Sequence, residues 1–563
     1  MSVLTAPKLA PTPVRRPATR AWITLTPAAL TLALGLWGIR RENTLWGDEA
    51  VTYDLAHRTL PQIWATAQHI DLVHALYYAV MHAVFTLLGD GLVPLRLPSV
   101  LATTAAAAGV TALGVRLAGP RAGLLAGLTF AVLPQVQKYA QEGRSYAMVC
   151  ALITWATLAL ITPTRWRWTA YGSTMLLACL LHEFAALALA AHATTLLLSR
   201  APRRLLSAWV LTATSVITGL LPLAIRSASQ SAQLSWLESP VRLPGVLLMM
   251  AVAVACALTP PRARNLVRLT TLAFARRPAR TMAAAVACAV TPSRARNSAH
   301  LTAPPSRTRN PALACARTPS RAQGPIHLTA LALPLAVLPT LLLLLASLAK
   351  PLFVDRYVLY STTGTALLLG ACLDHALRRT PLITYAALLT ALTALIPPSL
   401  TLRTPESRTN NATAITAAIL QAARPGDGLL YLPAHHRTLT TPTAPLPTDL
   451  ALSQTPTASN TLTGTELPAP DITARLLTFT RIIVLHTPPG PTPPTPEDQA
   501  KTNTLHHHFR PHTSTQLHGA RITIYTRLPS PSPAGGTHKP NNDRKKPNAP
   551  KLPTPGKNDP AAR

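Results

Sequence analysis

The chain has 563 residues, of which 48% are hydrophobic and only 13% charged, and its mean hydropathy is +0.24. This composition excludes a simple globular protein, because leucine, alanine and valine occur in long blocks of the length that crosses a hydrocarbon core. The formal net charge of +32 would suit a nucleic-acid-binding protein. Much of it lies in short arginine clusters between the apolar blocks, which is typical of cytoplasmic loops. We therefore expect a membrane protein without a nucleic-acid partner.

The N-terminal region predicts a short cytoplasmic tail followed by a retained first helix. Arginines at positions 15, 16 and 20 precede a largely apolar run at 21–39, and basic residues before a span keep that end in the cytoplasm. No small-residue cleavage site follows the run, so it does not have the pattern of a signal peptide. Residues 40–97 are then expected outside the cytoplasm, with a short apolar helix at 74–88 lying along the membrane interface.

The remaining apolar blocks raise the predicted number of spans to about eleven, so the expected fold class is a polytopic α-helical membrane protein of the cell membrane. They lie at 98–115, 122–136, 147–161, 169–181, 184–198, 206–224, 243–258, 327–349, 358–374 and 381–399. With this arrangement nearly every arginine cluster between spans falls on the cytoplasmic side, and the acidic residues between spans fall mainly on the other. Everything after about residue 400 is then expected to be extracytoplasmic.

The segment 259–326 departs from this pattern. ACALTPPRARN at 255–265 returns as ACAVTPSRARN at 287–297, and partly again at 314–324. A solenoid unit would carry a helical or strand period in each copy, and these copies have little periodicity. We interpret the segment as a low-complexity basic cytoplasmic insertion. The alternative is a basic patch that binds anionic lipid headgroups.

The region after residue 400 predicts a small α/β domain. Strand-like apolar runs occur at 424–433, 481–489 and 520–528, and a helical stretch precedes them at 411–423. Three adjacent histidines at 506–508 are more often incidental on a loop than metal ligands, so no metal site is predicted there. The predicted organisation is a cytoplasmic tail at 1–20, a transmembrane domain at 21–399, an extracytoplasmic α/β domain at 400–528 and a Pro/Lys/Asn-rich disordered tail at 529–563.

Polar and ionisable side chains collect at the expected outer ends of the spans, where such groups usually line a water-filled cavity. A carboxylate can take a proton from an attacking hydroxyl, and an arginine can hold a phosphate with two hydrogen bonds. Together with tryptophan and tyrosine faces for sugar rings, these residue types fit glycosyl transfer from a lipid phosphate. The set comprises Asp48, Glu49, His74, Tyr77, Arg96, Glu142, Arg144, Tyr146, His182, Glu183, Trp236, Asp355, Arg356 and Tyr357.

NTLWGDEAVTYDLA at 43–56 resembles the first-loop motif of the GT-C superfamily of membrane glycosyltransferases, in particular glycosyltransferase family 39 and its polyprenyl-phosphate-mannose mannosyltransferase-like relatives. The resemblance continues, in the family's order, through YAQEGRSYAMVCAL, LHEFAALAL and FVDRYVLYS, and it covers most of 20–400. It implies an inverting enzyme that moves a sugar, mannose being the first expectation, from a polyprenyl-phosphate donor on the extracytoplasmic face. The acceptor stays open among protein, lipid and polysaccharide.

The resemblance also implies roles for individual residues. Asp48 is the expected catalytic base, with Glu49 beside it as helper or neighbour. His74 stands where the family has His-Pro-Pro, although alanine and leucine follow it here. The expected donor-phosphate and substrate-binding residues are Glu142, Arg144, Tyr146, Arg356, Tyr357, His74 and His182. A lipid phosphate can leave without a nucleotide, so no cofactor is required, and an assisting divalent cation at the carboxylates remains an option that no motif indicates.

Two other classes of function stay open. A transporter or lipid flippase predicts inverted internal repeats and Gly/Pro-broken spans at matching positions, and the sequence shows no such pairing. A catalytically degenerate relative that serves as a membrane scaffold is compatible with the insertion at 259–326. The structural test of the enzyme hypothesis is whether Asp48, Glu142 and Arg356 come together.

Overall fold

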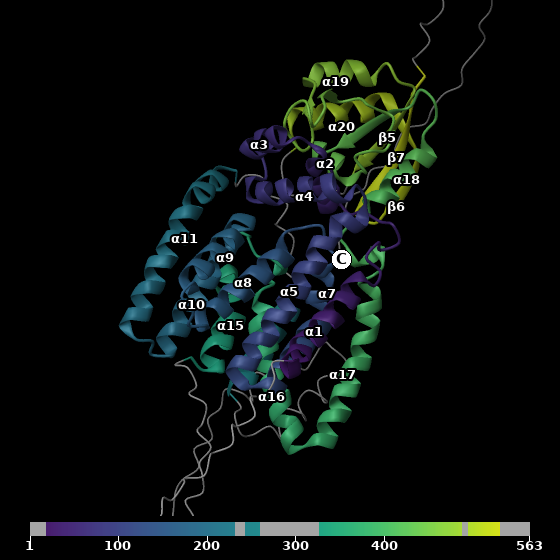
Figure 1. Ribbon diagram of the computed structural model, residues 1–563. Coiled ribbons are helices and arrows are strands. Elements are labelled where there is room, and N and C mark those ends of the chain that lie inside the picture. The colour runs from purple at the N-terminus through teal and green to yellow at the C-terminus, as the bar shows by residue number, and fades with distance from the viewer. Residues whose placement is uncertain (1–17, 231–242, 259–325, 487–493, 530–563) are drawn as a thin grey trace, which may run out of the picture.

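The structure is a computed structural model that describes residues 18–230, 243–258, 326–486 and 494–529. A bundle of helices forms one end of the molecule and an α/β domain forms the other (Figure 1). Three shorter helices, in purple in Figure 1, lie where the two parts meet: α2 (Gly47–His57), α3 (Leu60–His69) and α4 (Ala75–Leu88). The repeat-bearing insertion and the C-terminal tail lie outside the described residues, apart from Ile326 and Pro529 at their edges.

Each of the segments predicted as a span overlaps a helix of the bundle. By length and composition, α5, α11, α15 and α17 are long and apolar enough to cross a membrane, and several of the others are shorter apolar helices. The bundle helices are α1 (Ala18–Leu36), α5 (Leu92–Ala118), α6 (Pro120–Val132), α7 (Pro134–Ala140), α8 (Tyr146–Ile161), α9 (Arg167–Leu181), α10 (Leu187–Leu198), α11 (Arg203–Ser229), α12 (Leu243–Leu258), α15 (Leu328–Ala346), α16 (Ser361–Arg379) and α17 (Pro381–Thr401).

The interior of the bundle depends on small residues that let helices approach closely. A Cβ atom added at Gly370 of α16 would lie 2.5 Å from the Ala126 backbone nitrogen of α6. Large apolar side chains on the outside are left uncovered, and Leu382 of α17 is 83% exposed. Small residues between helices and exposed leucines around them are the pattern expected of helices that pack within a bilayer.

A chain of buried polar side chains connects four helices of the bundle. The Trp209 indole N–H of α11 donates to the Tyr171 hydroxyl of α9 over 3.0 Å. That hydroxyl lies 2.9 Å from His192 Nδ1 of α10, and His192 Nε2 lies 2.9 Å from the Thr157 hydroxyl of α8. The Thr157 hydroxyl donates its single proton to the Ile153 oxygen over 2.7 Å, so it accepts from the Nε2–H of a neutral imidazole, and Nδ1 then accepts from the tyrosine. Every member therefore has a partner.

Replacing the central histidine should destabilise the bundle. His192→Leu leaves the Tyr171 O–H without an acceptor in a dry environment, which costs about 1–3 kcal/mol, whereas the Thr157 hydroxyl keeps its bond to the Ile153 oxygen. We expect a lower thermal midpoint for the detergent-solubilised protein. Thr194→Val on the same helix is the control, since the Thr194 hydroxyl bonds only to the backbone of its own helix. Equal midpoints for the two variants would contradict a stabilising role of the network.

The C-terminal domain is a sheet covered by helices on both faces. The strand order is β2-β1-β5-β7-β6, in which β1 is parallel to β2 and β5, and β7 is antiparallel to β5 and β6. The sheet strands are β1 (Gly428–Leu432), β2 (Thr448–Asp449), β5 (Arg481–His486), β6 (Phe509–Leu517) and β7 (Ala520–Arg527), and β3 (Leu452–Gln454) pairs separately with β4 (Thr465–Glu466). The helices are α18 (Ala412–Ala422), α19 (Ala469–Leu476) and α20 (Pro496–His508).

Alternation along the central strands explains why both faces are covered. Leu430 and Val484 pack with residues of α19 and α20, whereas Leu429 and Ile483 pack with residues of α18. Strand side chains alternate between faces with a period of two, so a continuous apolar run has one apolar side chain for each layer. The predicted strands and the predicted helix at 411–423 coincide with β1, β5, β7 and α18. The histidines at 506–508 end helix α20 and do not lie on a loop.

Candidate active site

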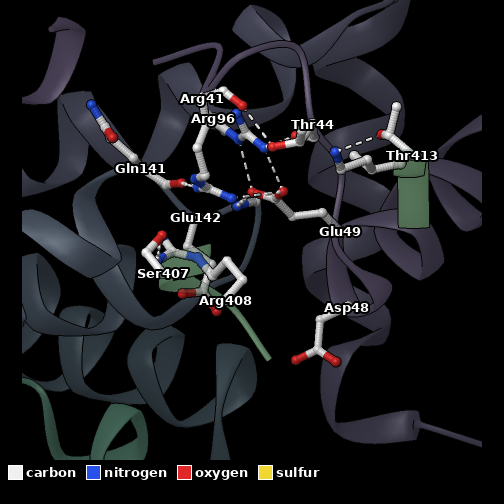
Figure 2. A network of polar contacts seen from close by, with 12 residues as sticks. Arg41, Thr44, Asp48, Glu49, Arg96, Gln141, Glu142, Ser407, Arg408 and Thr413 are labelled. Atoms are coloured by element: carbon white, nitrogen blue, oxygen red, sulfur yellow. Dashed lines mark hydrogen bonds and ion pairs between the residues drawn. The ribbon is translucent and has the colours of Figure 1, made fainter. Parts of the chain in front are cut away.

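Asp48 and Glu49 both lie in the first turn of α2, but their side chains point in different directions. Neighbouring residues of an α-helix are turned by about 100° from each other. The Asp48 side chain is 29% exposed, whereas that of Glu49 is completely buried. Figure 2 shows the two carboxylates pointing away from each other. The two acids therefore have separate surroundings.

The Glu49 carboxylate is held by Arg96 of α5 in a bidentate ion pair. Arg96 Nε lies 2.8 Å from Oε1 and Nη2 lies 2.6 Å from Oε2. Arg41 Nη1 lies 3.5 Å from Oε2, and the Gly143 N–H donates to Oε1 over 3.1 Å. Arg96 also donates to the backbone oxygens of Ile39 and Thr44, so one pair joins three segments (Figure 2).

These contacts make Glu49 a structural anion. Burial alone would raise its pKa, but the Arg96 and Arg41 guanidinium groups outweigh burial and hold the pKa of Glu49 at about 2. Its oxygens are already occupied by donors and have no exposure to solvent. The helper role expected for Glu49 beside Asp48 is therefore not the role that this geometry favours.

Asp48 lies between two arginines from distant parts of the chain. Arg356 Nη1 lies 3.1 Å from Asp48 Oδ2, and Arg144 Nη2 lies 3.8 Å from Oδ1. The same Arg356 nitrogen lies 3.9 Å from Glu142 Oε1. Arg356 is in the 3₁₀ turn η4 (Asp355–Val358), and Glu142 and Arg144 belong to the loop between α7 and α8. The three residues of the structural test thus come together around one guanidinium group.

Glu142 is the second carboxylate of this group and is almost fully buried. Burial raises its pKa, against the opposing effect of the nearby guanidinium groups of Arg408 and Arg356. Its Oε1 has no hydrogen-bond partner among the described residues. A buried carboxylate oxygen without a donor is costly unless something else satisfies it.

Aromatic rings surround the Arg356 guanidinium. Its carbon lies 5.7 Å from the ring centre of Trp46, 5.3 Å from that of Tyr146 and 5.9 Å from that of Tyr357. Cations over aromatic faces gain electrostatic stabilisation, and planar guanidinium groups stack well. The rings hold the cation in place between Asp48 and Glu142. They also provide apolar faces of the kind against which sugar rings pack.

Two histidines continue this aromatic wall. The His182 ring lies 4.5 Å from Tyr357 and 5.7 Å from His74. Burial lowers the pKa of His182 well below its ordinary value, so this imidazole is neutral at physiological pH. Nδ1 of His182 and Nε2 of His74 are buried without a hydrogen-bond partner among the described residues. Both rings thus retain unused hydrogen-bonding atoms beside the site.

Asp71 organises this side of the site, and sequence reasoning overlooked it. His74 Nδ1 lies 2.7 Å from Asp71 Oδ1, the Tyr78 hydroxyl donates to Oδ2, and Arg144 donates to that hydroxyl over 2.8 Å. Although desolvation alone would raise it, the pKa of Asp71 is held at about 2, mainly by His74 and Arg144. Asp71 has a left-handed backbone with φ of 58°. In the sequence, Asp71 stands three residues before His74 and seven before Tyr78, a spacing that can place the three side chains on one face of a helix.

The remaining predicted residues have other surroundings. Glu183 accepts a hydrogen bond from Ser227 over 2.7 Å, and Asp355 accepts one from Tyr139 over 2.7 Å. Tyr77 is fully buried, and Trp236 lies outside the described residues. No cluster of three or more His, Cys, Asp or Glu side chains suited to a metal ion occurs in the part of the chain that the structure describes. The acids near Asp48 face arginines instead.

Taken together, the fold and site define a helical protein with membrane-length helices and a polar, arginine-rich centre beneath an α/β domain. No protein-family model matches the chain, and no curated protein matches it either. The chain is similar to the solved structure of ArnT from Cupriavidus metallidurans in the apo state, with 12% identity and a TM-score of 0.48, covering 90% of this chain and 98% of that one.

Two further solved structures show similarity. For ArnT from Cupriavidus metallidurans bound to undecaprenyl phosphate, the identity is 11% and the TM-score 0.46, covering 91% of this chain and 99% of that one. For the archaeal oligosaccharyltransferase AglB from Archaeoglobus fulgidus, in complex with an inhibitory peptide and a dolichol-phosphate, the identity is 13% and the TM-score 0.40, covering 83% and 70%. These identities and TM-scores indicate distant similarity only. The roles of the site residues are inferred from contacts within this chain.

Removing the buried anion should destabilise the protein strongly. Glu49→Gln leaves Arg96 charged and without its anion, and breaking a buried pair on one side costs about 3–5 kcal/mol. We expect a large fall in the thermal midpoint in detergent. Glu42→Gln, at an exposed acid in the preceding turn, is the control and should change the midpoint little.

The same pair predicts a pH dependence in the wild type. The pKa of Glu49 is about 2 in the folded protein and 4.5 ordinarily, so its stabilisation is complete above about pH 4.5 and is lost as the pH falls towards 2. Thermal midpoints measured across this range should fall more for the wild type than for Glu49→Gln. Parallel curves would contradict the assignment.

Proposed function

We propose that this chain is an integral-membrane glycosyltransferase that moves a sugar from a polyprenyl-phosphate donor to an acceptor hydroxyl. Mannose is the sugar we propose first, and the acceptor is a protein, lipid or polysaccharide. The observation that carries the proposal is the contact of one guanidinium group, Arg356, with both a partly exposed carboxylate, Asp48, and a buried one, Glu142. The proposed base, Asp48, and the proposed phosphate-binding cation, Arg356, therefore lie close enough for one sugar-phosphate to contact both.

The reaction follows from these groups. Asp48 accepts the proton of the acceptor hydroxyl, and the resulting oxygen attacks the anomeric carbon of the donor sugar. The bond from that carbon to the lipid phosphate oxygen breaks, and its electron pair leaves with the phosphate. Arg356 and Arg144 offset the charge that develops on the departing phosphate. In-line attack with a lipid phosphate as leaving group inverts the anomeric configuration.

The aromatic rings around Arg356 support its assignment as the phosphate-binding cation and that of Asp48 as the base. A guanidinium group has five N–H donors, so it can hold a phosphate while remaining close to Asp48. Trp46, Tyr146 and Tyr357 restrict its movement, which reduces the reorganisation needed when the phosphate binds. Glu142 Oε1 is available to a hydroxyl of the sugar. A divalent cation could assist at the carboxylates, but the reaction as proposed does not require one.

We further propose that the N-terminus is cytoplasmic and that the C-terminal domain and the site face the extracytoplasmic side. Two basic turns support this orientation. Arg121 lies in the first turn of α6, directly after the turn at Gly119 that joins it to α5, and Arg379 is the last residue of α16, just before the turn to α17. Figure 1 shows both turns at the end of the bundle opposite to the C-terminal domain. Basic loops remain on the cytoplasmic side.

Loss of the proposed base should abolish transfer. Asp48→Asn keeps the shape but removes the proton acceptor, and we expect turnover with a labelled polyprenyl-phosphate sugar to fall about 10²–10⁴-fold. Asp54→Asn is a matched control on the same helix, because the Asp54 side chain is also 29% exposed and contacts an arginine. Wild-type turnover in Asp48→Asn would remove Asp48 as the base. Absence of transfer by the wild type itself would favour a scaffold or a transporter.

The role of Arg356 predicts a separate signature. Arg356→Gln should lower kcat/KM about 10²–10³-fold, because a preorganised donor to the leaving phosphate is lost. It should also weaken competition by a free polyprenyl phosphate, which contains the phosphate but no sugar. Arg226→Gln, at an exposed arginine of α11, is the control. Unchanged inhibition by the free lipid phosphate in Arg356→Gln would place the phosphate elsewhere.

A further inference from the structure

The loop that leads into α2 is hydrogen-bonded to the start of the C-terminal domain. The Leu45 N–H donates to Thr413 Oγ1 over 2.9 Å, and the Leu45 oxygen accepts from the Ala412 N–H over 2.9 Å. The Gly47 N–H donates to Asn410 Oδ1 over 2.7 Å. Figure 2 shows Thr413 beside the loop that leads into α2. The residues immediately before Asp48 are thus attached to another domain.

The contact of Gly47 with Asn410 satisfies a requirement of the helix. The first N–H groups of an α-helix have no partner within the helix, and a polar side chain at the N-cap position usually accepts one of them. The N-cap residue of α2 is Trp46, which makes no capping hydrogen bond with its side chain. The Asn410 carbonyl oxygen takes over this function for Gly47, the first residue of α2. The cap of the helix that contains Asp48 comes from the other domain.

Asn410 is itself fixed by the turn between β6 and β7. The next residue, Asn411, donates its N–H to the His518 oxygen over 3.3 Å. Gly519 follows with φ of 93°, and a Cβ atom there would lie 2.3 Å from the Cβ of Asn410. On the opposite side, a Cβ at Gly47 would lie 3.3 Å from Asn410 Nδ2. Asn410 is therefore packed between two glycines with little freedom to move.

We propose that Asn410 is a positioning residue for Asp48, acting as the N-cap of α2 from the C-terminal domain. Its catalytic consequence rests on the function proposed above. Without the cap the first turn of α2 loosens, and Asp48 lies in that turn while Glu49 is held separately by Arg96. A displacement of about 1 Å of a catalytic group costs on the order of 10²-fold in rate. The C-terminal domain is by this inference part of the catalytic assembly.

The experiment compares two substitutions of Asn410 by two independent measurements. Asn410→Ala removes the acceptor, and Asn410→Asp retains one. We measure kcat and KM for a polyprenyl-phosphate sugar, and amide hydrogen exchange of peptides spanning 43–50 in the full-length protein. We expect Asn410→Ala to lower kcat about 10-fold or more with KM within about 3-fold, and to speed exchange at the start of α2. Asn410→Asp should restore most of both. Asn503→Ala, at an exposed asparagine of α20, is the control.

A second pair of variants tests whether Asn410 positions α2, by changing the residue that packs against Asn410 in the turn between β6 and β7. Gly519→Ala adds a methyl group against Asn410, whereas Gly426→Ala is a control with similarly positive φ of 88° and nothing within 4 Å of the added atom. Both suffer backbone strain, but only Gly519→Ala should displace Asn410 and reproduce the exchange and kcat changes.

The outcomes separate this proposal from the proposed function. Wild-type exchange at 43–50 in Asn410→Ala overturns the cap, whatever the activity. Faster exchange with unchanged kcat overturns the positioning role. Equal loss of kcat in Asn410→Asp and Asn410→Ala also overturns it, because the retained acceptor should rescue. If the wild type transfers no sugar, the proposed function fails, while the exchange experiment still decides whether Asn410 caps α2.

Discussion

The bidentate ion pair between Glu49 and Arg96 is the interaction on which the geometry of the site depends. It joins α2 to α5 and, through the Gly143 N–H, to the loop that contains Glu142 and Arg144. A buried ion pair of this kind brings little net stability but strongly penalises any arrangement that separates its members. The cost of separating them keeps these segments in register, so Asp48 has a defined position relative to Arg144 and Arg356.

A second consequence is that two neighbouring acids are used for different purposes. Glu49 is fully surrounded by donors, whereas the Asp48 side chain is partly exposed and its carboxylate faces Arg144 and Arg356. Consecutive residues of an α-helix point in directions about 100° apart, so the Glu49 side chain points inwards to α5 while the Asp48 side chain points outwards. Glu142 resembles neither of them, since it is buried yet keeps an oxygen without a donor.

Much of the fold could be predicted from the sequence, because apolar blocks such as 381–399 and strand-like runs such as 481–489 identify their elements locally. The grouping of Asp48, Glu142 and Arg356 also followed from placing all three at the same ends of the helices. The burial of Glu49 could not be predicted, since it depends on a partner 47 residues later in α5. The same holds for Asn410, whose contact with Gly47 spans 363 positions and has no local pattern.

The separation of Gly47 and Asn410 along the chain also determines when the cap can form during synthesis. At about 5–20 residues per second, synthesis of the intervening 363 positions takes about 20–70 seconds. During that interval α2 has no Asn410 to accept from its first N–H group. The β6–β7 turn that fixes Asn410 is made later still. On the proposed assignment, a nascent chain could bind lipid before it could transfer sugar, so competence would begin only once the last strands have folded.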